Sequence, residues 1–348
     1  MKIEFNKIPT FSQLRESVQA LTADTFEEVA LQVFHYQAIH NPIYREYLSY
    51  LRVNPDQIQR LSAIPFLPIG FFKHHQVLTG TPVIRTVFES SGTTGSQTSR
   101  HLVADLGWYD NISTEIFEQT YGPLKDFHLL ALLPSYLERN NSSLVYMVQQ
   151  FIAKTHSPVS GFFLHNVDEL LNVFRKQAYQ SDGRKVILWG VTFALLDLAE
   201  SKNDLSFLRE LPKLMVMETG GMKGRRREML REEVHAELTE AFGVKSIHSE
   251  YGMTELLSQS YSKGEGIFDT SRTMRILLRD TNDPFSVVDA PQSGMRYGGI
   301  NVVDLGNLDS CSFIETQDLG RFVGDSSSQF EVIGRFDNSD IRGCNLLI

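Results

Sequence analysis

Residues 88–100 read Phe88-Glu89-Ser90-Ser91-Gly92-Thr93-Thr94-Gly95-Ser96-Gln97-Thr98-Ser99-Arg100, and this stretch decides how the rest of the chain is interpreted. It follows an extended segment, residues 82–88, and combines two glycines with a run of hydroxyl side chains. Glycine lets backbone N–H groups approach a ligand closely, and Ser and Thr supply small donors. A concave donor surface of this kind suits phosphate oxygens. The stretch therefore predicts a phosphate-binding loop, and a plain polar surface loop is the alternative.

The loop matches neither of the two commonest nucleotide-binding patterns. No Lys follows Gly95, so the GxxxxGK[ST] pattern is absent, and the glycine spacing is not GxGxxG. Its core, residues 90–95, resembles the phosphate-binding loop of the adenylate-forming superfamily, whose members join a carboxylate to AMP. Within that superfamily it is similar to the phenylacetate–CoA ligases and the acyl-protein synthetases. The usual Pro-Lys pair is missing, and we expect Arg100 to supply the positive charge.

The bulk properties are those of a soluble globular protein. The chain has 348 residues, of which 42% are hydrophobic and 22% charged, and its net charge is −9. That charge excludes a global basic field that would attract nucleic acid. The first seven residues contain no apolar signal core, and no apolar run reaches the ~20 residues of a membrane helix. The only cysteines, Cys311 and Cys344, make no disulfide framework, so we expect a cytoplasmic protein.

Strands and helices alternate along most of the chain, which predicts an α/β architecture with a largely parallel sheet. The apolar runs 128–133 and 185–190 read as buried strands, 213–218 as a third strand and 246–248 as a short fourth one. Helices are expected at 26–41, 43–51, 113–121, 143–152, 193–200 and 225–242. Beyond Gly266, five short strands joined by polar turns predict a smaller β-rich lobe at about 267–333. We expect residues 1–333 to form one adenylate-forming domain and residues 334–348 a hinge-like tail.

An apolar segment broken by prolines, residues 64–73, precedes the loop. Proline excludes a long helix, so this segment is expected to be an extended connector packed on the core. A similar Pro-Phe-Leu-Pro segment with a later Phe-Lys precedes the loop in acyl-protein synthetases.

A second polar group, residues 249–255, follows the last of the four strands. An aromatic ring stacks on a purine, a Thr hydroxyl reaches a phosphate, and a carboxylate holds Mg²⁺. A plain turn and helix start is the alternative. The segment resembles the YGxTE motif of the superfamily. That resemblance implies that Tyr251 stacks on adenine beside Gly252, that Thr254 contacts the α-phosphate, and that Glu255 binds Mg²⁺.

A glycine-rich turn, residues 219–225, follows the third strand and would allow close backbone approach to a flat base. The alternative is a strand-to-helix turn with solvated arginines. In the superfamily a glycine pair lies beside adenine at this place, which implies that Gly220 and Gly221 do so here. Lys223 would add charge toward the phosphates.

Two later segments also resemble the superfamily. Residues 316–320 are similar to its Thr-Gly-Asp segment, with Gln in place of Gly, and residues 333–337 are similar to Gly-Arg-x-Asp. The resemblance implies that Asp318 accepts the ribose hydroxyls and that Arg335 contacts ribose or the α-phosphate. These motifs occur in the superfamily's order over residues 90–340, so the resemblance covers nearly all the chain.

The superfamily usually continues into a mobile C-terminal domain with a catalytic Lys, and this chain ends just past the hinge position. The LuxE-type acyl-protein synthetases also lack that domain and carry the acyl group on a cysteine near the C-terminus. Cys344 matches that placement, beside Gly343 and near Arg342, and an inert cysteine in a docked tail is the alternative. Cys311 lies in a strand-like run and is expected in the core.

The resulting hypothesis is an AMP-forming ligase that uses ATP and Mg²⁺ to activate a fatty or other carboxylic acid. Cys344, Thr254 and Arg335 are its expected catalytic residues, and the acyl group would pass to a partner such as an acyl reductase or a carrier. An apolar tunnel near Tyr136, Trp189 and Gly190 would hold the acyl chain. Two alternatives stay open: an acyl- or aryl-CoA ligase that works with a separate C-terminal domain, and a nucleotide-binding subunit without turnover.

Overall fold

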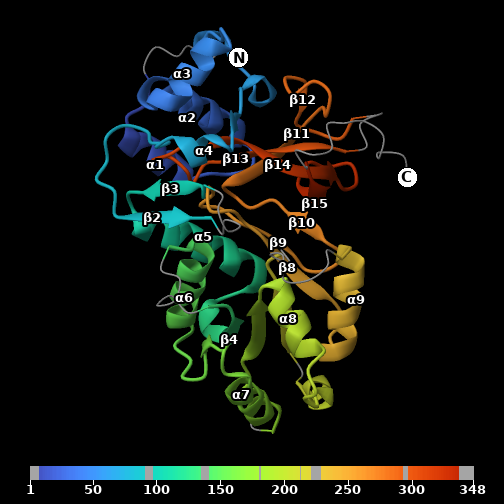
Figure 1. Ribbon diagram of the computed structural model, residues 1–348. Coiled ribbons are helices and arrows are strands. Elements are labelled where there is room, and N and C mark those ends of the chain that lie inside the picture. The colour runs from blue at the N-terminus through green and yellow to red at the C-terminus, as the bar shows by residue number, and fades with distance from the viewer. Residues whose placement is uncertain are drawn as a thin grey trace. The chain divides into compact units, whose positions relative to one another are not determined.

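The computed structural model describes residues 8–90, 97–134, 141–179, 182–211, 213–220, 229–292 and 297–336. It divides into two compact units, which are treated separately below. The first unit comprises Met1–Val83 and Asp269–Ile348, and the second comprises Ile84–Phe268. Figure 1 labels their helices and strands. None of the helices among the described residues is long and apolar enough to cross a membrane.

The second unit is built on a parallel sheet in the order β8-β7-β6-β4-β5. Its strands are β4 (Phe127–Leu132), β5 (Gly161–Phe162), β6 (Lys185–Gly190), β7 (Leu214–Glu218) and β8 (Ile247–Tyr251). Strand β9 (Ser260–Ser262) pairs antiparallel with β8. All six residues of β4 are buried, as expected for a parallel strand covered on both faces. The predicted α/β architecture with a largely parallel sheet is confirmed.

Helices cover both faces of this sheet, and the pleat determines which residues each face presents (Figure 1). Trp189 of β6 lies 6.1 Å, ring centre to ring centre, from Phe117 of α5 (Leu106–Tyr121) and from Phe151 of α6 (Ser143–Thr155). The next position along the strands points to the other face. There Glu218 of β7 accepts a hydrogen bond from Thr192 of α8 (Thr192–Ala199).

Further elements complete the second unit. Strands β2 (Thr86–Glu89) and β3 (Arg100–Val103) form an antiparallel hairpin in which Glu89 pairs with Arg100. The other elements are α7 (Val167–Tyr179), α9 (Arg231–Phe242), and the 3₁₀ turns η3 (Leu124–Asp126) and η4 (Ser206–Glu210). Strand β10 (Ile267–Asp269) lies at the boundary between the units.

The first unit combines N-terminal helices with a C-terminal antiparallel sheet. The sheet runs β12 (Val287–Val288), β11 (Met274–Arg279), β13 (Gly298–Asp304), β14 (Phe313–Phe322) and β15 (Gln329–Arg335) in spatial order. Strand β1 (Leu67–Pro68) pairs in parallel with β14. The helical elements are α1 (Phe11–Gln19), α2 (Phe26–His40), α3 (Pro42–Tyr50), α4 (Phe71–His74), η1 (Pro55–Gln57) and η2 (Leu61–Ala63).

One aromatic cluster joins the two ends of the chain in the first unit. The ring of Phe313 on β14 lies 5.9 Å from Phe34, 6.3 Å from Tyr44 and 6.2 Å from Phe66. All four side chains are buried. The proline-broken segment 64–73 therefore packs on the core through Phe66 and β1. The segment ends in the short helix α4, which the sequence did not predict.

Several predicted element boundaries are wrong. The helix expected from residue 225 begins at Arg231, because Leu230 is extended with ψ 149°. Strand β8 continues to Tyr251, so the first part of the segment 249–255 lies on a strand rather than on a turn. Helix α5 begins seven residues earlier than expected, where the Asp105 carboxylate accepts a hydrogen bond from the Trp108 amide. Helices α1 and α7 and the hairpin partner β3 were not predicted.

A buried glutamine ties α2 to the turn before β14. The Gln37 amide nitrogen donates to the carbonyls of Asn307 (3.1 Å) and Leu308 (3.2 Å), and its oxygen accepts from the Ser312 amide at 2.9 Å. Its side chain is fully buried. Removing this side chain leaves buried polar groups without partners. The desolvation cost of such groups is larger than the net stabilisation that the hydrogen bonds provide.

We expect Gln37→Leu to lower the free energy of unfolding by roughly 3 kcal/mol, because the Ser312 amide and the Leu308 carbonyl lose their partner inside the core and the Asn307 carbonyl loses one of its donors. Urea denaturation followed by circular dichroism measures this change. Gln57→Leu, at an exposed position, is the control and should stay within about 0.5 kcal/mol of the parent protein. Equal effects of the two substitutions would show that the hydrogen bonds of Gln37 contribute nothing specific.

Candidate active site

The carboxyl ends of three neighbouring strands meet in the second unit. Gly190 of β6 pairs with Glu218 of β7, and Glu218 pairs with Ser249 of β8. Ligands of parallel α/β sheets bind at such carboxyl ends. The glycine-bearing turn at Gly220 and the segment around Tyr251 both begin at this edge, so the sheet brings two of the predicted motifs together.

A buried carboxylate holds the first of these turns. Glu218 is 6% exposed and accepts hydrogen bonds from Thr192 Oγ1 (2.9 Å) and from the Gly220 amide (2.5 Å). His235 Nε2 of α9 lies 3.8 Å from the other carboxylate oxygen. Burial raises the pKa of Glu218, but the donors outweigh burial and leave the pKa below its usual value. The ionised carboxylate therefore fixes Gly220, whose φ of 72° suits glycine.

The end of β8 carries a second acidic side chain with opposite behaviour. Burial and the negative charge of Glu218 raise the pKa of Glu250 to about 8. Its carboxylate oxygen lies over the backbone of Gly252, where an added Cβ would collide with it. A side chain at position 252 would therefore displace the Glu250 carboxylate from its present place. Tyr251 itself is buried, with its ring 5.8 Å from that of Phe268.

The hairpin β2–β3 places the ends of the predicted phosphate loop. The Ser90 amide donates to the Ser99 carbonyl at 3.1 Å, and the Ser99 amide donates to Ser90 Oγ at 3.0 Å. Asn141 supports the hairpin from outside, because its side chain donates to Glu89 Oε2 at 2.7 Å. These bonds hold Ser90 and Ser99, the residues on either side of the predicted loop, next to each other.

A buried histidine connects this hairpin to the segment after β8. His101 of β3 is 1% exposed, and its Nδ1 lies 2.8 Å from the carbonyl oxygen of Thr254. A carbonyl only accepts, so Nδ1 carries the proton and donates. Strand β3 and the segment of Thr254 are thus held next to each other. No sequence signal pointed to His101, since a single histidine after a polar loop has no characteristic spacing.

The predicted magnesium ligand lies in the same segment. Glu255 is 5% exposed. Among the residues that the structure describes, no group of three or more His, Cys, Asp or Glu side chains could hold a metal ion. Mg²⁺ bound to a nucleotide needs only one or two protein carboxylates, because phosphates and water complete its shell. A single carboxylate such as that of Glu255 meets this requirement, and the role of Glu255 stays a prediction.

The remaining two described nucleotide-binding candidates belong to the first unit. Asp318 of β14 and Arg335 of β15 are register partners, and Arg335 Nε lies 3.2 Å from Asp318 Oδ1. The Asp318 side chain is largely buried and that of Arg335 is exposed. The structure therefore brings together a largely buried carboxylate and the exposed cation that pairs with it. Their roles toward a nucleotide stay predictions.

Several predicted positions lie outside the described residues. They are Ser91, Gly92, Thr93, Thr94, Gly95, Tyr136, Gly221, Lys223 and Cys344. Of the expected acyl tunnel, Trp189 and Gly190 are described. Trp189 is fully buried, and a Cβ on Gly190 would come within 2.9 Å of Leu195. Both positions are closely packed. Cys311 is buried as expected, and burial raises the pKa of its thiol to about 12, which makes it unreactive.

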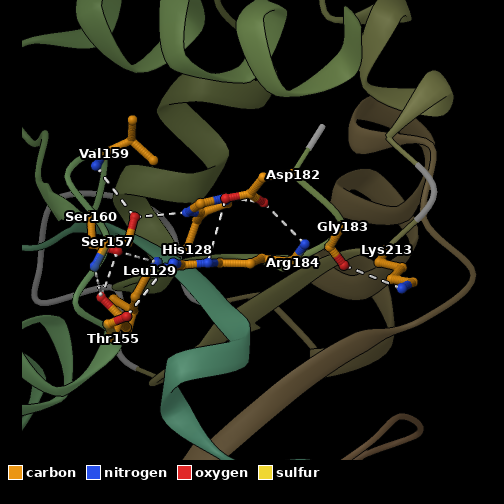
Figure 2. A network of polar contacts seen from close by, with 10 residues as sticks. All are labelled: His128, Leu129, Thr155, Ser157, Val159, Ser160, Asp182, Gly183, Arg184 and Lys213. Atoms are coloured by element: carbon orange, nitrogen blue, oxygen red, sulfur yellow. Dashed lines mark hydrogen bonds and ion pairs between the residues drawn. The ribbon is translucent and has the colours of Figure 1, made fainter. Parts of the chain in front are cut away.

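A further polar network, shown in Figure 2, lies at the amino end of β4. His128 is 2% exposed, with Nδ1 2.7 Å from Ser157 Oγ and Nε2 3.0 Å from Asp182 Oδ1. The order resembles a Ser-His-Asp triad, which the sequence did not predict. However, the histidine is buried and Asp182 is 48% exposed, the reverse of the exposure that triad chemistry needs. Its position away from the carboxyl ends indicates that it ties loops to the sheet.

Comparisons with known proteins agree with this fold. Residues 21–348 match the family model described as acyl-protein synthetase, LuxE, and the chain therefore belongs to that family. No curated protein sequence matches the chain.

Three solved structures resemble it. The acyl acid amido synthetase AtGH3.15 in complex with 2,4-DB is 11% identical, with a TM-score of 0.54 over 95% of this chain and 72% of that chain. An acyl-CoA synthetase from Brucella canis is 16% identical (TM-score 0.46, 73% of this chain, 46% of that chain). IdnL1 is 14% identical (TM-score 0.43, 64% and 49%). The chain spans about half the length of the last two, and the first supports the fold alone.

With ATP–pyrophosphate exchange as the assay of the activity proposed below, we expect His101→Leu to reduce the rate by about ten- to a hundredfold, because the Thr254 carbonyl loses its donor and its segment moves relative to β3. His101→Asn, whose amide nitrogen lies near the position of Nδ1, should retain more activity than the leucine variant. His74→Leu, at an exposed histidine, is the control. Equal activity of the leucine and asparagine variants would contradict a role for the hydrogen bond.

A second prediction concerns the network of Figure 2. Burial raises the pKa of Asp182, but bonds from the Arg184 amide and His128 and their charges outweigh it and lower the pKa. This carboxylate therefore stabilises the fold above its unfolded pKa of about 4, and the contribution is lost as the pH falls through its lower folded pKa. Asp182→Asn should lower the melting temperature at pH 6, and the difference should vanish toward pH 2–3. Asp168→Asn, at an exposed position, controls for the lost charge.

Proposed function

We propose that this protein activates a carboxylic acid with ATP as an acyl-adenylate and then transfers the acyl group to a cysteine thiol. The proposal is supported by membership of the acyl-protein synthetase family. The observation that carries it in the structure is the contact from His101 Nδ1 to the Thr254 carbonyl. That contact joins strand β3, which follows residues 90–95, to the segment of Thr254. We propose that side chains of both segments contact one phosphate group.

The nucleotide would be held by side chains of different chemistry. Hydroxyls and amides of residues 90–95 would take the phosphate oxygens. Tyr251 would stack on adenine beside Gly252 and the turn of Gly220, Gly221 and Lys223. Asp318 would accept from the ribose hydroxyls, Arg335 would contact ribose or the α-phosphate, and Mg²⁺ on Glu255 would neutralise charge.

In the first step a carboxylate oxygen of the acid attacks the α-phosphorus, and the bond to the bridging oxygen of pyrophosphate breaks. The residues named above would position this in-line attack and stabilise the developing charge, with Thr254 and Arg335 at the reacting phosphate. The products are acyl-AMP and pyrophosphate.

In the second step a thiol sulfur attacks the acyl carbonyl carbon, and AMP leaves. We propose Cys344 as this thiol and a protein such as an acyl reductase or a carrier as the final acceptor. A fatty acid is the expected substrate. The protein is expected to be cytoplasmic.

The first step predicts acid-dependent exchange of labelled pyrophosphate into ATP. Glu255→Gln should reduce this exchange by at least about tenfold, because the carboxylate that would hold Mg²⁺ is lost, and higher Mg²⁺ should restore part of it. Glu237→Gln, at an exposed position of α9, is the control. Tight AMP binding without any exchange by the parent protein would instead support the nucleotide-binding subunit.

The second step predicts that labelled fatty acid stays bound to the denatured protein and that Cys344→Ser abolishes this label while leaving pyrophosphate exchange intact. Label retained in the Ser variant would disprove Cys344 as the nucleophile. Thioester formation after addition of coenzyme A to this chain alone would favour an acyl-CoA ligase.

A further inference from the structure

Glu250 is an acidic residue that the proposed nucleotide contacts leave unused. It is the fourth residue of β8, directly before Tyr251, and its carboxylate lies against the backbone of Gly252. It is partly exposed. Among the residues that the structure describes, its carboxylate makes no hydrogen bond or ion pair. An acidic group without a partner, at the edge of the sheet where ligands bind, is suited to act on a substrate.

Glu250 and Glu218 form a pair of carboxyl groups with divided properties. Donors from Thr192 and Gly220 hold Glu218 in its ionised form. Its negative charge, together with burial, raises the pKa of Glu250 to about 8. Two nearby carboxyl groups whose pKa values are driven apart characterise acid–base sites.

The other titratable groups around Glu250 are fixed in one state near neutral pH. Tyr261 of β9 is its register partner, and burial followed by the charge of Glu250 raises the pKa of that tyrosine well above its usual value. His248, on the same face of β8, has its pKa lowered to about 4 by burial and by Lys263. Its Nδ1 lies 3.2 Å from Tyr121 Oη of α5. Of these groups, Glu250 alone changes its protonation between pH 7 and 9.

We propose that the Glu250 carboxylate accepts the proton of the acyl-accepting thiol during acyl transfer. This inference rests on the proposed function, because the acyl-adenylate would lie beside Tyr251 and Thr254. The S–H bond breaks, and the proton moves to a Glu250 oxygen. The sulfur forms a bond to the acyl carbon, and the bond from that carbon to the phosphate oxygen breaks. AMP leaves with the electron pair, and Glu250 later releases the proton to water.

The acid–base match favours this role. An ordinary cysteine thiol has a pKa of about 8.5, so most of it is protonated at pH 7.5. A general base is most effective when its own pKa lies near the operating pH, and it contributes on the order of 10²–10⁴-fold. A thiol that is already ionised needs no base, and this difference separates a proton acceptor from a structural residue.

The test compares two small thiols as acyl acceptors at pH 7.5, after acyl-adenylate has formed from ATP and labelled fatty acid. One is an aliphatic thiol, largely protonated at this pH, and the other is an aromatic thiol, largely ionised. For Glu250→Gln we expect transfer to the aliphatic thiol to fall at least about a hundredfold, while transfer to the aromatic thiol changes less than about threefold. Pyrophosphate exchange should remain within about threefold of the parent, because the first step does not use Glu250.

Glu237→Gln is the matched control and should leave all three rates unchanged. An equal loss with both thiols, a loss of pyrophosphate exchange, or undiminished transfer to the aliphatic thiol would each overturn the assignment. Absence of exchange in the parent protein would instead refute the proposed function, so the two failures are distinguishable.

Discussion

The candidate site depends on one buried interaction, the carboxylate of Glu218 at the end of β7. Burying an ionised carboxylate costs several kcal/mol unless donors replace water. Here the donors come from two sides: the first turn of α8 supplies Thr192 Oγ1, and the glycine turn supplies the Gly220 amide. His235 of α9 faces the other oxygen. Because losing a donor removes part of what replaces water around this charge, the interaction holds the glycine turn in place relative to the sheet and to both helices.

The first unit is organised by a different constraint, a core shared by distant parts of the chain. Phe34 and Tyr44 come from the N-terminal helices, whereas Phe313 comes from β14. A buried arginine orders the strands: Arg279 donates to the carbonyls of Ile300 and Thr316. An added Cβ on Gly299 would collide with its guanidinium, so that glycine is required by packing. This explains why the C-terminal strands belong to the same compact unit as the N-terminal helices.

Local patterns predicted much of the fold, and long-range contacts account for what they missed. Strands β4 and β6 are buried on both faces, and such strands need apolar residues at nearly every position. Both strands therefore stand out in the sequence as apolar runs. The helix before Asn41-Pro42 was predicted, although Thr25 bonds to Thr22 instead of capping it. His101 was missed because its partner Thr254 lies 153 residues further along the chain. No spacing rule connects such residues, and only the folded structure shows that they meet.

The two glutamates at the ends of β7 and β8 show how placement, rather than residue type, assigns chemistry. In the sequence Glu218 and Glu250 look alike, because each is an acidic residue with a glycine two positions later. The sheet pairs Glu218 with Ser249, so the adjacent residue, Glu250, points to the opposite face. There Tyr261 is its register partner, and none of the residues that the structure describes donates a hydrogen bond to it. One carboxylate is therefore kept ionised to hold the backbone, and its charge makes it harder for the other to ionise. The Glu218 carboxylate thus has two effects in these three strands: it fixes the glycine turn, and its charge raises the pKa of Glu250 into the range of an acid–base group.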